Sequence, residues 1–318
     1  MKRTRLLQAP AATATAVVLA ALAGSSCKRT EKGEPQARAT SSISAGPAES
    51  ARPPEVPPLT LEPTMPPSQS LRRDQVARTF QFDAAEDKPA LKIDEHLERT
   101  VRILSGDTRS VQGIEIAVAE ATTTTTLGSA APRTVTDPRQ GRKFRIQSKL
   151  GEARVTDESG TPVPANLATQ IIGDHVELGL PFPLFSALPQ GPIEPGERLD
   201  LSHDSVLALF PVDADGDFDV TRLALEFVAS QRQEATFRAA TRFWGTHDKR
   251  RIELDLVGQL VVRKPEAWPT RIELEGPAKL LAATGDATAT PQTGRARIKI
   301  TSKYESPGPV PSPSARNR

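Results

Sequence analysis

The 318-residue sequence is poor in several residue types that usually carry structure or chemistry. It has one cysteine, so no disulfide can form within the chain, and aromatic residues make up only 4% of it. The 41 basic and 39 acidic side chains are interspersed, with a formal net charge of +2. A basic stripe with interleaved aromatic residues, as nucleic-acid binding requires, is therefore lacking, and we expect no nucleic-acid partner.

Residues 1–26 have the pattern of an export signal peptide. A basic head at Lys2, Arg3 and Arg5 precedes an apolar run, Ala11 to Ala23, that is too short to span a bilayer comfortably. No later segment is apolar and long enough to do so. The sequence thus predicts an exported protein.

Cys27 directly follows this run and resembles the lipid-attachment cysteine of bacterial lipoproteins, although Gly24 stands where a branched aliphatic residue is usual. Acyl chains at Cys27 would tether the protein to a membrane surface. We expect a lipid anchor in the cell envelope of a bacterium. The alternative is cleavage after Ala23, which would leave a free thiol on a secreted or periplasmic protein.

Composition divides the remainder into three parts. Residues 27–70 are rich in proline, serine and alanine and have few aliphatic side chains, which is typical of a disordered tether. Residues 71–306 are predicted to form one β-rich domain. Residues 307–318 repeat the tether's composition and are predicted to be a disordered tail.

The clearest structural pattern lies in Arg251 to Glu275. Apolar and charged residues alternate with a period of two, as in a strand with one buried face, and the alternation resumes after a turn at Pro265 to Pro269. This predicts a hairpin. Gly258 interrupts the first strand and favours sharp coiling over close approach of another backbone.

The segments before this hairpin predict shorter elements. Ala90 to Leu104 fits a strand or a capped helix, and the turn that follows favours the strand. Gly128 to Arg142 is predicted to be a loop. We expect further strands at Gln75 to Phe82, Val111 to Thr126, Lys143 to Lys149 and Ala153 to Thr156, a helix from Pro164 to Leu178, and a short helix capped by Ser202.

Five strands of about ten residues follow, at Val220 to Ala229, Ala235 to Trp244, Arg251 to Arg263, Arg271 to Leu281 and Arg295 to Tyr304. The predicted fold is mainly β (α+β), with a long, strongly curved antiparallel β-meander or open half-barrel and one or two covering helices. The residues expected to face a ligand or the core are Leu223, Leu225, Phe227, Phe237, Phe243, Ile252, Leu254, Leu256, Ile272 and Leu274.

The chain from Lys143 to Tyr304 resembles a group of uncharacterised bacterial predicted lipoproteins. The shared features are a strand pair, a helix, a Leu-Pro connector, a Pro-Gly-Glu turn and a final meander. The resemblance implies an architecture and no activity. At a looser level, an export signal, a tether and a curved sheet resemble periplasmic carriers of lipids and lipoproteins, which is an analogy of fold alone.

No catalytic, cofactor-binding or metal-binding residues are predicted. The histidines, His96, His175, His203 and His247, have no spacing typical of a metal site. Asp213 to Asp219 departs from a calcium loop, since its glycine comes early and no glutamate follows at the required distance, and Ser202 to Ser205 favours a helix start over a triad. Of the two tryptophans, Trp244 and Trp268, Trp244 marks either a sheet edge or mouth where a partner docks or ordinary turn packing.

These patterns predict a non-enzymatic, exported and lipid-anchored envelope protein that binds or shields an apolar ligand or a protein partner. The alternative is a structural or assembly lipoprotein without a ligand cavity, and a hydrolase is a third, weaker reading. The sequence leaves the oligomeric state and the choice of membrane open.

Overall fold

The computed structural model describes residues 56–305, except 86–87, 108–109, 150–151, 174, 176–177, 179–183, 185–187, 190, 202–205, 207–208, 210–216, 248–249 and 282–290. The predicted signal peptide, Cys27, most of the tether and the predicted tail lie outside the described residues.

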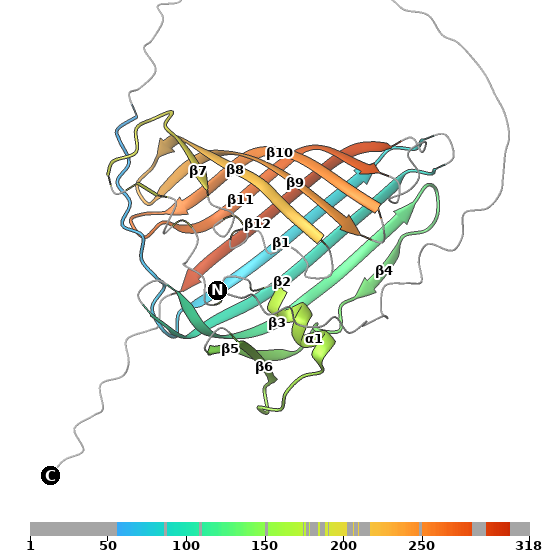
Figure 1. Cartoon of the computed structure of the whole chain (residues 1–318), viewed down its shortest axis with the longest axis horizontal. Helices are drawn as coiled ribbons and strands as arrows, with labels where there is room; N and C mark the ends of the chain where they lie inside the picture. The colour runs from blue at the N-terminus through green and yellow to red at the C-terminus, as the bar shows by residue number, and fades with distance from the viewer. Residues whose placement is uncertain are drawn as a thin grey trace, which may run out of the picture. The chain divides into compact units, whose positions relative to one another are not determined.

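The described residues build one antiparallel 12-stranded sheet (Figure 1). Its strand order is β6-β5-β3-β2-β1-β12-β11-β10-β9-β8-β7, and β4 pairs with β3 off this path. Neighbours in the sheet are mostly neighbours in sequence, but β1 pairs along its whole length with β12 and so joins the two ends of the folded chain. The strands are β1 (Leu71–Phe82), β2 (Leu91–Gly106), β3 (Val111–Leu127), β4 (Arg133–Thr136), β5 (Lys143–Lys149), β6 (Glu152–Asp157), β7 (Arg198–Leu201), β8 (Asp217–Ser230), β9 (Glu234–His247), β10 (Arg250–Arg263), β11 (Trp268–Leu281) and β12 (Gln292–Glu305).

The predicted β class, meander and hairpin are confirmed. In β10 the side chains of Leu254, Leu256 and Leu260 are buried, whereas Val257 between them is 56% exposed. The ambiguous segment at Ala90 to Leu104 forms the strand β2, as predicted. The sheet therefore has an inner face, whose side chains are buried, and an outer face, whose side chains are exposed to solvent.

Several predicted boundaries are wrong. The predicted loop at Gly128 to Arg142 contains β4, and β7 was not predicted at all; both are four-residue strands, too short to show an alternation. Helix α1 covers Ala165–Gly173 and ends before the predicted Leu178. Of the segment after Ser202, Val206 and Leu209 are helical and buried, and the rest lies outside the described residues.

The folded part begins at Val56, not at Leu71 as the composition predicts. Leu59 is 2% exposed and exchanges two backbone hydrogen bonds with Ile193, at 2.9 and 2.8 Å. The indole Nε1 of Trp268 donates to the carbonyl oxygen of Thr64 at 2.6 Å. A proline-rich segment has few apolar side chains to bury. Burial of a few leucines, such as Leu59, is nevertheless enough to hold this segment against the sheet.

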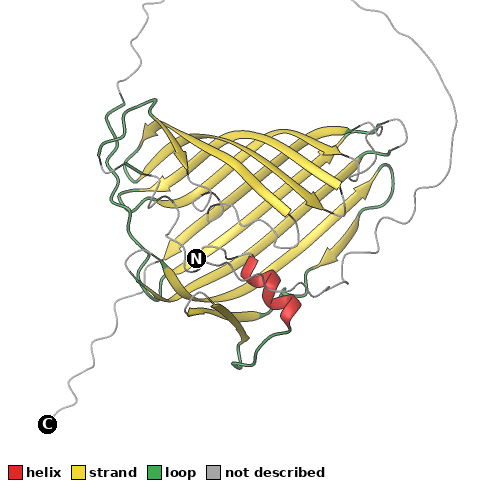
Figure 2. Ribbon diagram, in the orientation of Figure 1, coloured by secondary structure: helices red, strands yellow, loops and turns green. Residues whose placement is uncertain are grey.

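Three glycines on the inner face explain the strong curvature of the sheet (Figure 2). A Cβ atom at Gly258 would collide with the backbone carbonyl of Glu273 on the neighbouring strand. Gly276 on β11 and Gly294 on β12 meet neighbouring backbones in the same way, and with Gly258 they form a diagonal row across three strands. Without side chains along this diagonal, the strands can close inward.

Two apolar clusters occupy the inner face. The larger one covers the inner side of β7 to β12 and part of β1, together with Leu59, Leu184 and Ile193 from outside the sheet. The smaller one lies between β2, β3, β5 and β6 and is covered by Leu167 and Ile171 of α1. No helix among the described residues is long and apolar enough to cross a membrane.

Candidate functional site

Charged side chains interrupt the inner face between the two apolar clusters. We call this group the polar centre: Arg72 and Asp74 of β1, Arg99 of β2, Ser302 of β12 and His175 after α1. Asp74 is 3% exposed and Arg99 is 6% exposed. They share the inner face because Asp74 pairs in register with Arg99 on one side and with Ser302 on the other.

Three groups donate hydrogen bonds to the carboxylate of Asp74. Arg72 Nε does so at 3.0 Å, Arg99 Nε at 3.1 Å and Ser302 Oγ at 2.8 Å. Burial by itself raises the pKa of Asp74, but the charges of Arg72 and Arg99 and the hydrogen bonds from Ser302 and Arg99 outweigh it and hold the pKa below its ordinary value of 3.8. Asp74 is therefore an anion that neutralises buried guanidinium charge.

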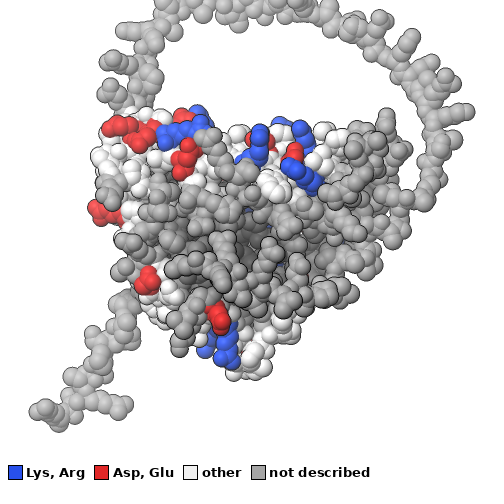
Figure 3. Space-filling model, viewed as in Figure 1, with Lys and Arg blue, Asp and Glu red and all other residues white. Residues whose placement is uncertain are grey.

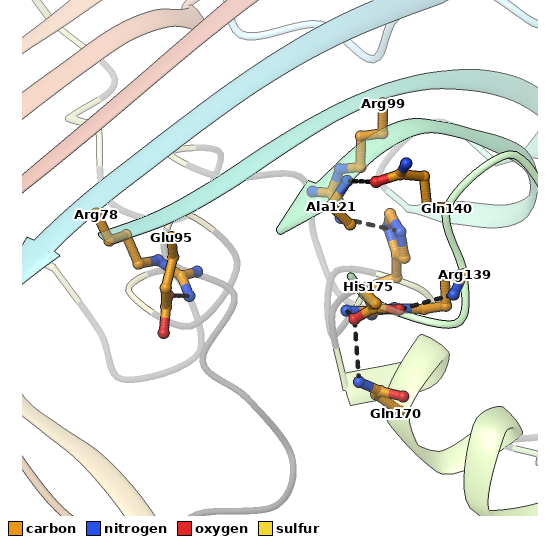
Figure 4. Close-up of polar contacts among 9 residues, drawn as sticks. Arg78, Glu95, Arg99, Ala121, Arg139, Gln140, Gln170 and His175 are labelled. Atoms are coloured by element: carbon orange, nitrogen blue, oxygen red, sulfur yellow. Dashed lines mark hydrogen bonds and ion pairs between the residues drawn. The ribbon is translucent and has the colours of Figure 1, made fainter. Parts of the chain in front are cut away.

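His175 connects this group to the segment after α1 (Figure 4). Its Nε2 lies 3.1 Å from Arg99 Nη1, and its side chain is buried. A guanidinium can only donate hydrogen bonds, so Nε2 of His175 accepts and the imidazole is neutral with its proton on Nδ1. Protonating His175 would place a second positive charge beside Arg99.

A second ion pair lies nearby on the loop before β5. Arg139 binds Asp137 through both carboxylate oxygens, at 2.8 and 2.7 Å, and Gln170 of α1 reaches the same carboxylate at 3.5 Å. On that loop Gln140 accepts a hydrogen bond from the backbone amide of Ala121 on β3, at 3.0 Å. These contacts fix the loop and α1 to the edge of the polar centre (Figure 4).

A cavity between α1 and the sheet has a volume of about 10 Å³, which is room for one water molecule and not for an apolar ligand. Its walls are Leu97, Arg99, Ile116, Val118, Arg139, Phe144, Ile171 and His175. The space beneath the predicted covering helix is thus closely packed.

Arg78 and Glu95 extend the charged row along β1 and β2. They face each other across the two strands at 3.2 Å, and their side chains are 22% and 31% exposed (Figure 4). Leu97 lies between this pair and Arg99 on the same face of β2 and packs against both apolar clusters. The inner face of β1 and β2 is therefore amphipathic, with ion pairs beside apolar side chains.

This arrangement is suited to binding and to holding shape. The polar centre contains charged groups that neutralise one another, and its one hydroxyl, Ser302 Oγ, donates to Asp74 and is not beside the histidine. The acceptor of Ser302 Oγ is the carboxylate of Asp74, whose pKa is held low by the charges of Arg72 and Arg99 and which is therefore a weak base.

The structure places the ten predicted inner-face residues in one cluster. Nine are at most 5% exposed, and Ile252 is half-buried against them. Those nine residues are Leu223, Leu225, Phe227, Phe237, Phe243, Leu254, Leu256, Ile272 and Leu274. They line the core, and whether a ligand also contacts them stays a prediction.

The tryptophans and the other residues singled out by the sequence do not come together in one site among the described residues. Trp268 is buried at the start of β11, with Arg263 stacked 4.0 Å from its ring, which is turn packing. Trp244 is half-buried beneath Arg251, whose guanidinium lies 5.2 Å from the ring centroid. Residues 202–205, with His203, and 213–216 lie outside the described residues, as does the side chain of His247.

Sequence reasoning missed the polar centre. The even positions of β1 share one face, which carries the charged Arg72, Asp74 and Arg78 as well as the apolar Val76, Phe80 and Phe82. The sequence alone therefore indicates that these charged side chains lie on the inner face. The partners on other strands could not be predicted, because Asp74 meets Arg99 and Ser302 only through the pairing of β1 with β2 and β12.

On the outer face, acidic and basic side chains alternate. In the view of Figure 3 they lie next to one another and do not gather into a patch of one sign. Arg242 binds Asp255 at 3.1 Å and Arg238 binds Glu226 at 3.1 Å, both across adjacent strands. The charged positions of the central hairpin are thus a solvated face, as predicted.

No protein-family model and no curated protein matches this chain, so the resemblance to a lipoprotein group stays a prediction. Among solved structures it is similar to a lipovitellin chain, from work on lipid–protein interactions in lipovitellin, with 7% identity and a TM-score of 0.43. The match covers 77% of this chain and 26% of that one, so this chain spans about a quarter of the lipovitellin chain.

It is also similar to DynF from the dynemicin biosynthesis pathway of Micromonospora chersina, with 9% identity and a TM-score of 0.21, over 80% of this chain and 92% of that one. At TM-scores this low neither similarity assigns a function.

Proposed function

We propose that this protein is an exported, non-enzymatic binding module of the bacterial cell envelope, anchored by acyl chains at Cys27, which holds an amphipathic lipid against the inner face of its sheet. The observation that carries the proposal is the composition of that face. Its larger apolar cluster spans seven strands and meets a row of ion pairs on β1 and β2, which matches the apolar tail and polar head of a lipid.

The inner face is covered at one end by an irregular segment that we call the cap: residues 56–61 and the described residues of 184–193. The cap buries Leu59, Leu184 and Ile193 and joins its two halves by the mutual hydrogen bonds of Leu59 and Ile193. In Figure 1 its N-terminal half runs along the ends of the strands where β10 turns into β11.

The described residues of the cap lie outside the strands and the helix of the fold, and a segment of this kind can open separately from the sheet. We infer that the lipid reaches the inner face when the cap opens and that the three apolar side chains of the cap occupy its place otherwise. Beside α1 the structure has a cavity with room for no more than one water, so this part of the inner face is closely packed.

Native mass spectrometry of the full-length protein, purified from a bacterial envelope, tests this proposal. We expect a population whose mass exceeds that of the acylated chain by the mass of a phospholipid, and the same lipid class in an organic extract. A protein that carries no lipid and takes none up from vesicles after delipidation would contradict the proposal.

The second candidate is a structural or assembly lipoprotein, and the close packing beside α1 favours it. In that case the cap never leaves the sheet, and cross-linking in the envelope would capture a protein partner while the extract contains no lipid beyond the anchor.

A further inference from the structure

Three metal-ligating side chains meet on the outer face of the sheet, away from the polar centre. His96 and Glu98 are two residues apart on β2 and so share a face, and Glu120 of β3 pairs in register with Glu98 beside a bulge. His96 Nε2 lies 3.6 Å from a carboxylate oxygen of each glutamate. The three ligand atoms all lie within 4.8 Å of one another.

The charge balance at this position differs from the rest of the outer face. Elsewhere an acidic residue typically faces a basic one, as in the pairs Glu115–Arg145, Glu226–Arg238, Asp255–Arg242 and Glu273–Lys299. Glu98 and Glu120 instead face each other, and carboxylates directly opposite on a sheet repel.

Within the described part of the chain, no lysine or arginine forms an ion pair with either glutamate. Their contacts are with His96 and, for Glu98, the amide of Gln75 at 2.9 Å. Among the described residues, the contacts of this carboxylate pair with a side chain that can carry positive charge are those of His96 alone.

We propose that His96, Glu98 and Glu120 bind a divalent cation of the zinc class through one imidazole nitrogen and two carboxylate oxygens. Zinc binds such ligands at roughly 2.0–2.2 Å in tetrahedral geometry, which places them about 3.3 Å apart, close to the 3.6 Å separations here. The three side chains are 38 to 48% exposed, so water completes the fourth position.

The sequence conceals this site because only one of its ligands is a histidine. Spacings such as His-x-x-x-His place two ligands on a helix, whereas His-x-Glu does so on a strand, and the third ligand comes from the neighbouring strand.

Isothermal titration with zinc chloride tests the proposal. The protein is the untagged full chain carrying Cys27→Ser, which removes its only thiol, at pH 7.5. We expect one zinc ion per chain, and at least a tenfold loss of affinity in His96→Ala and in Glu120→Gln, because weaker outer-shell changes already cost 10–100-fold. Glu115→Gln, on the same face of β3, is the matched control and should bind zinc as the parent does.

Glu120→Gln has the shape of the parent side chain, so it keeps the test valid if His96→Ala folds poorly. A parent protein that binds no zinc would overturn the proposal. Zinc binding that is equal in His96→Ala and the parent would also overturn it.

Discussion

Asp74 is a charged residue on the buried face of a strand, where an isolated carboxylate would be costly. It is stable there because three donors surround it and because it offsets the charges of Arg72 and Arg99. A buried ion network of this kind contributes little net stability when intact but a large penalty when one partner is removed. Its effect is to specify which strands pair.

Asp74→Asn is expected to lower the free energy of unfolding by about 3 kcal/mol at pH 7, since the buried Arg99 and the partly buried Arg72 lose a charged partner. Urea unfolding monitored by circular dichroism measures this. Asp255→Asn removes an exposed partner of Arg242 and should change stability by less than about 1 kcal/mol. Equal effects of the two substitutions would show that the Asp74 network is not a buried ion network.

The pH dependence follows from the same group. The folded-state pKa of Asp74 is lowered, so its stabilising contribution is present above the ordinary value of 3.8 and is lost as the pH falls through the folded pKa. Between pH 5 and pH 2 the parent should therefore lose more stability than Asp74→Asn. An identical loss in both proteins would contradict the assignment.

At the scale of the element, the alternation of apolar and polar residues predicts a strand wherever one face of that strand is apolar. The sequence predicts both the strands β10 and β11 and which side chains they bury. Apolar residues recur at every second position in each strand, as at Leu254 and Leu256 in β10 and at Ile272 and Leu274 in β11. β4 and β7 have four residues each and carry too few positions for a pattern. The polar centre was hidden because the pairing of β1 with β12 brings together residues more than two hundred positions apart.

The diagonal row of glycines gives a prediction of unusual sign. Alanine normally stabilises a strand relative to glycine, but Gly258→Ala would push a Cβ against the backbone of β11, and we expect it to destabilise the protein by about 1–3 kcal/mol. The midpoint of thermal or urea unfolding measures this.

Val257→Thr, at the adjacent exposed position, is the control and should change stability by at most about 0.5 kcal/mol. A Gly258→Ala variant as stable as the parent would mean that close strand approach at this glycine does not set the curvature.

At the scale of the whole molecule, the sheet is a continuous structure with short elements at both ends of its strand order, β6 and β7. Its inner face is filled by α1 on one side and by the cap and the segment of Val206 and Leu209 on the other. The compact unit that contains the sheet begins at Val56, so residues 56–70 belong to it together with the strands.

Labelling with a radioactive fatty acid tests the proposed anchor. We expect label on the full-length protein expressed in a bacterium and none on Cys27→Ser, because Cys27 is the only thiol in the chain. Label that persists in Cys27→Ser, or a parent protein that takes up none, would leave cleavage after Ala23 as the better reading.

The central claim is that a lipid reaches the inner face when the cap opens, and a disulfide across the cap tests it most directly. Leu59 and Ile193 exchange both backbone hydrogen bonds, a geometry close to that of a disulfide, so both can be replaced by cysteine in a Cys27→Ser background. The account predicts that native mass spectrometry detects phospholipid uptake from vesicles by the reduced protein and none by the oxidised protein. Equal uptake in the two redox states, or none in either, would contradict it.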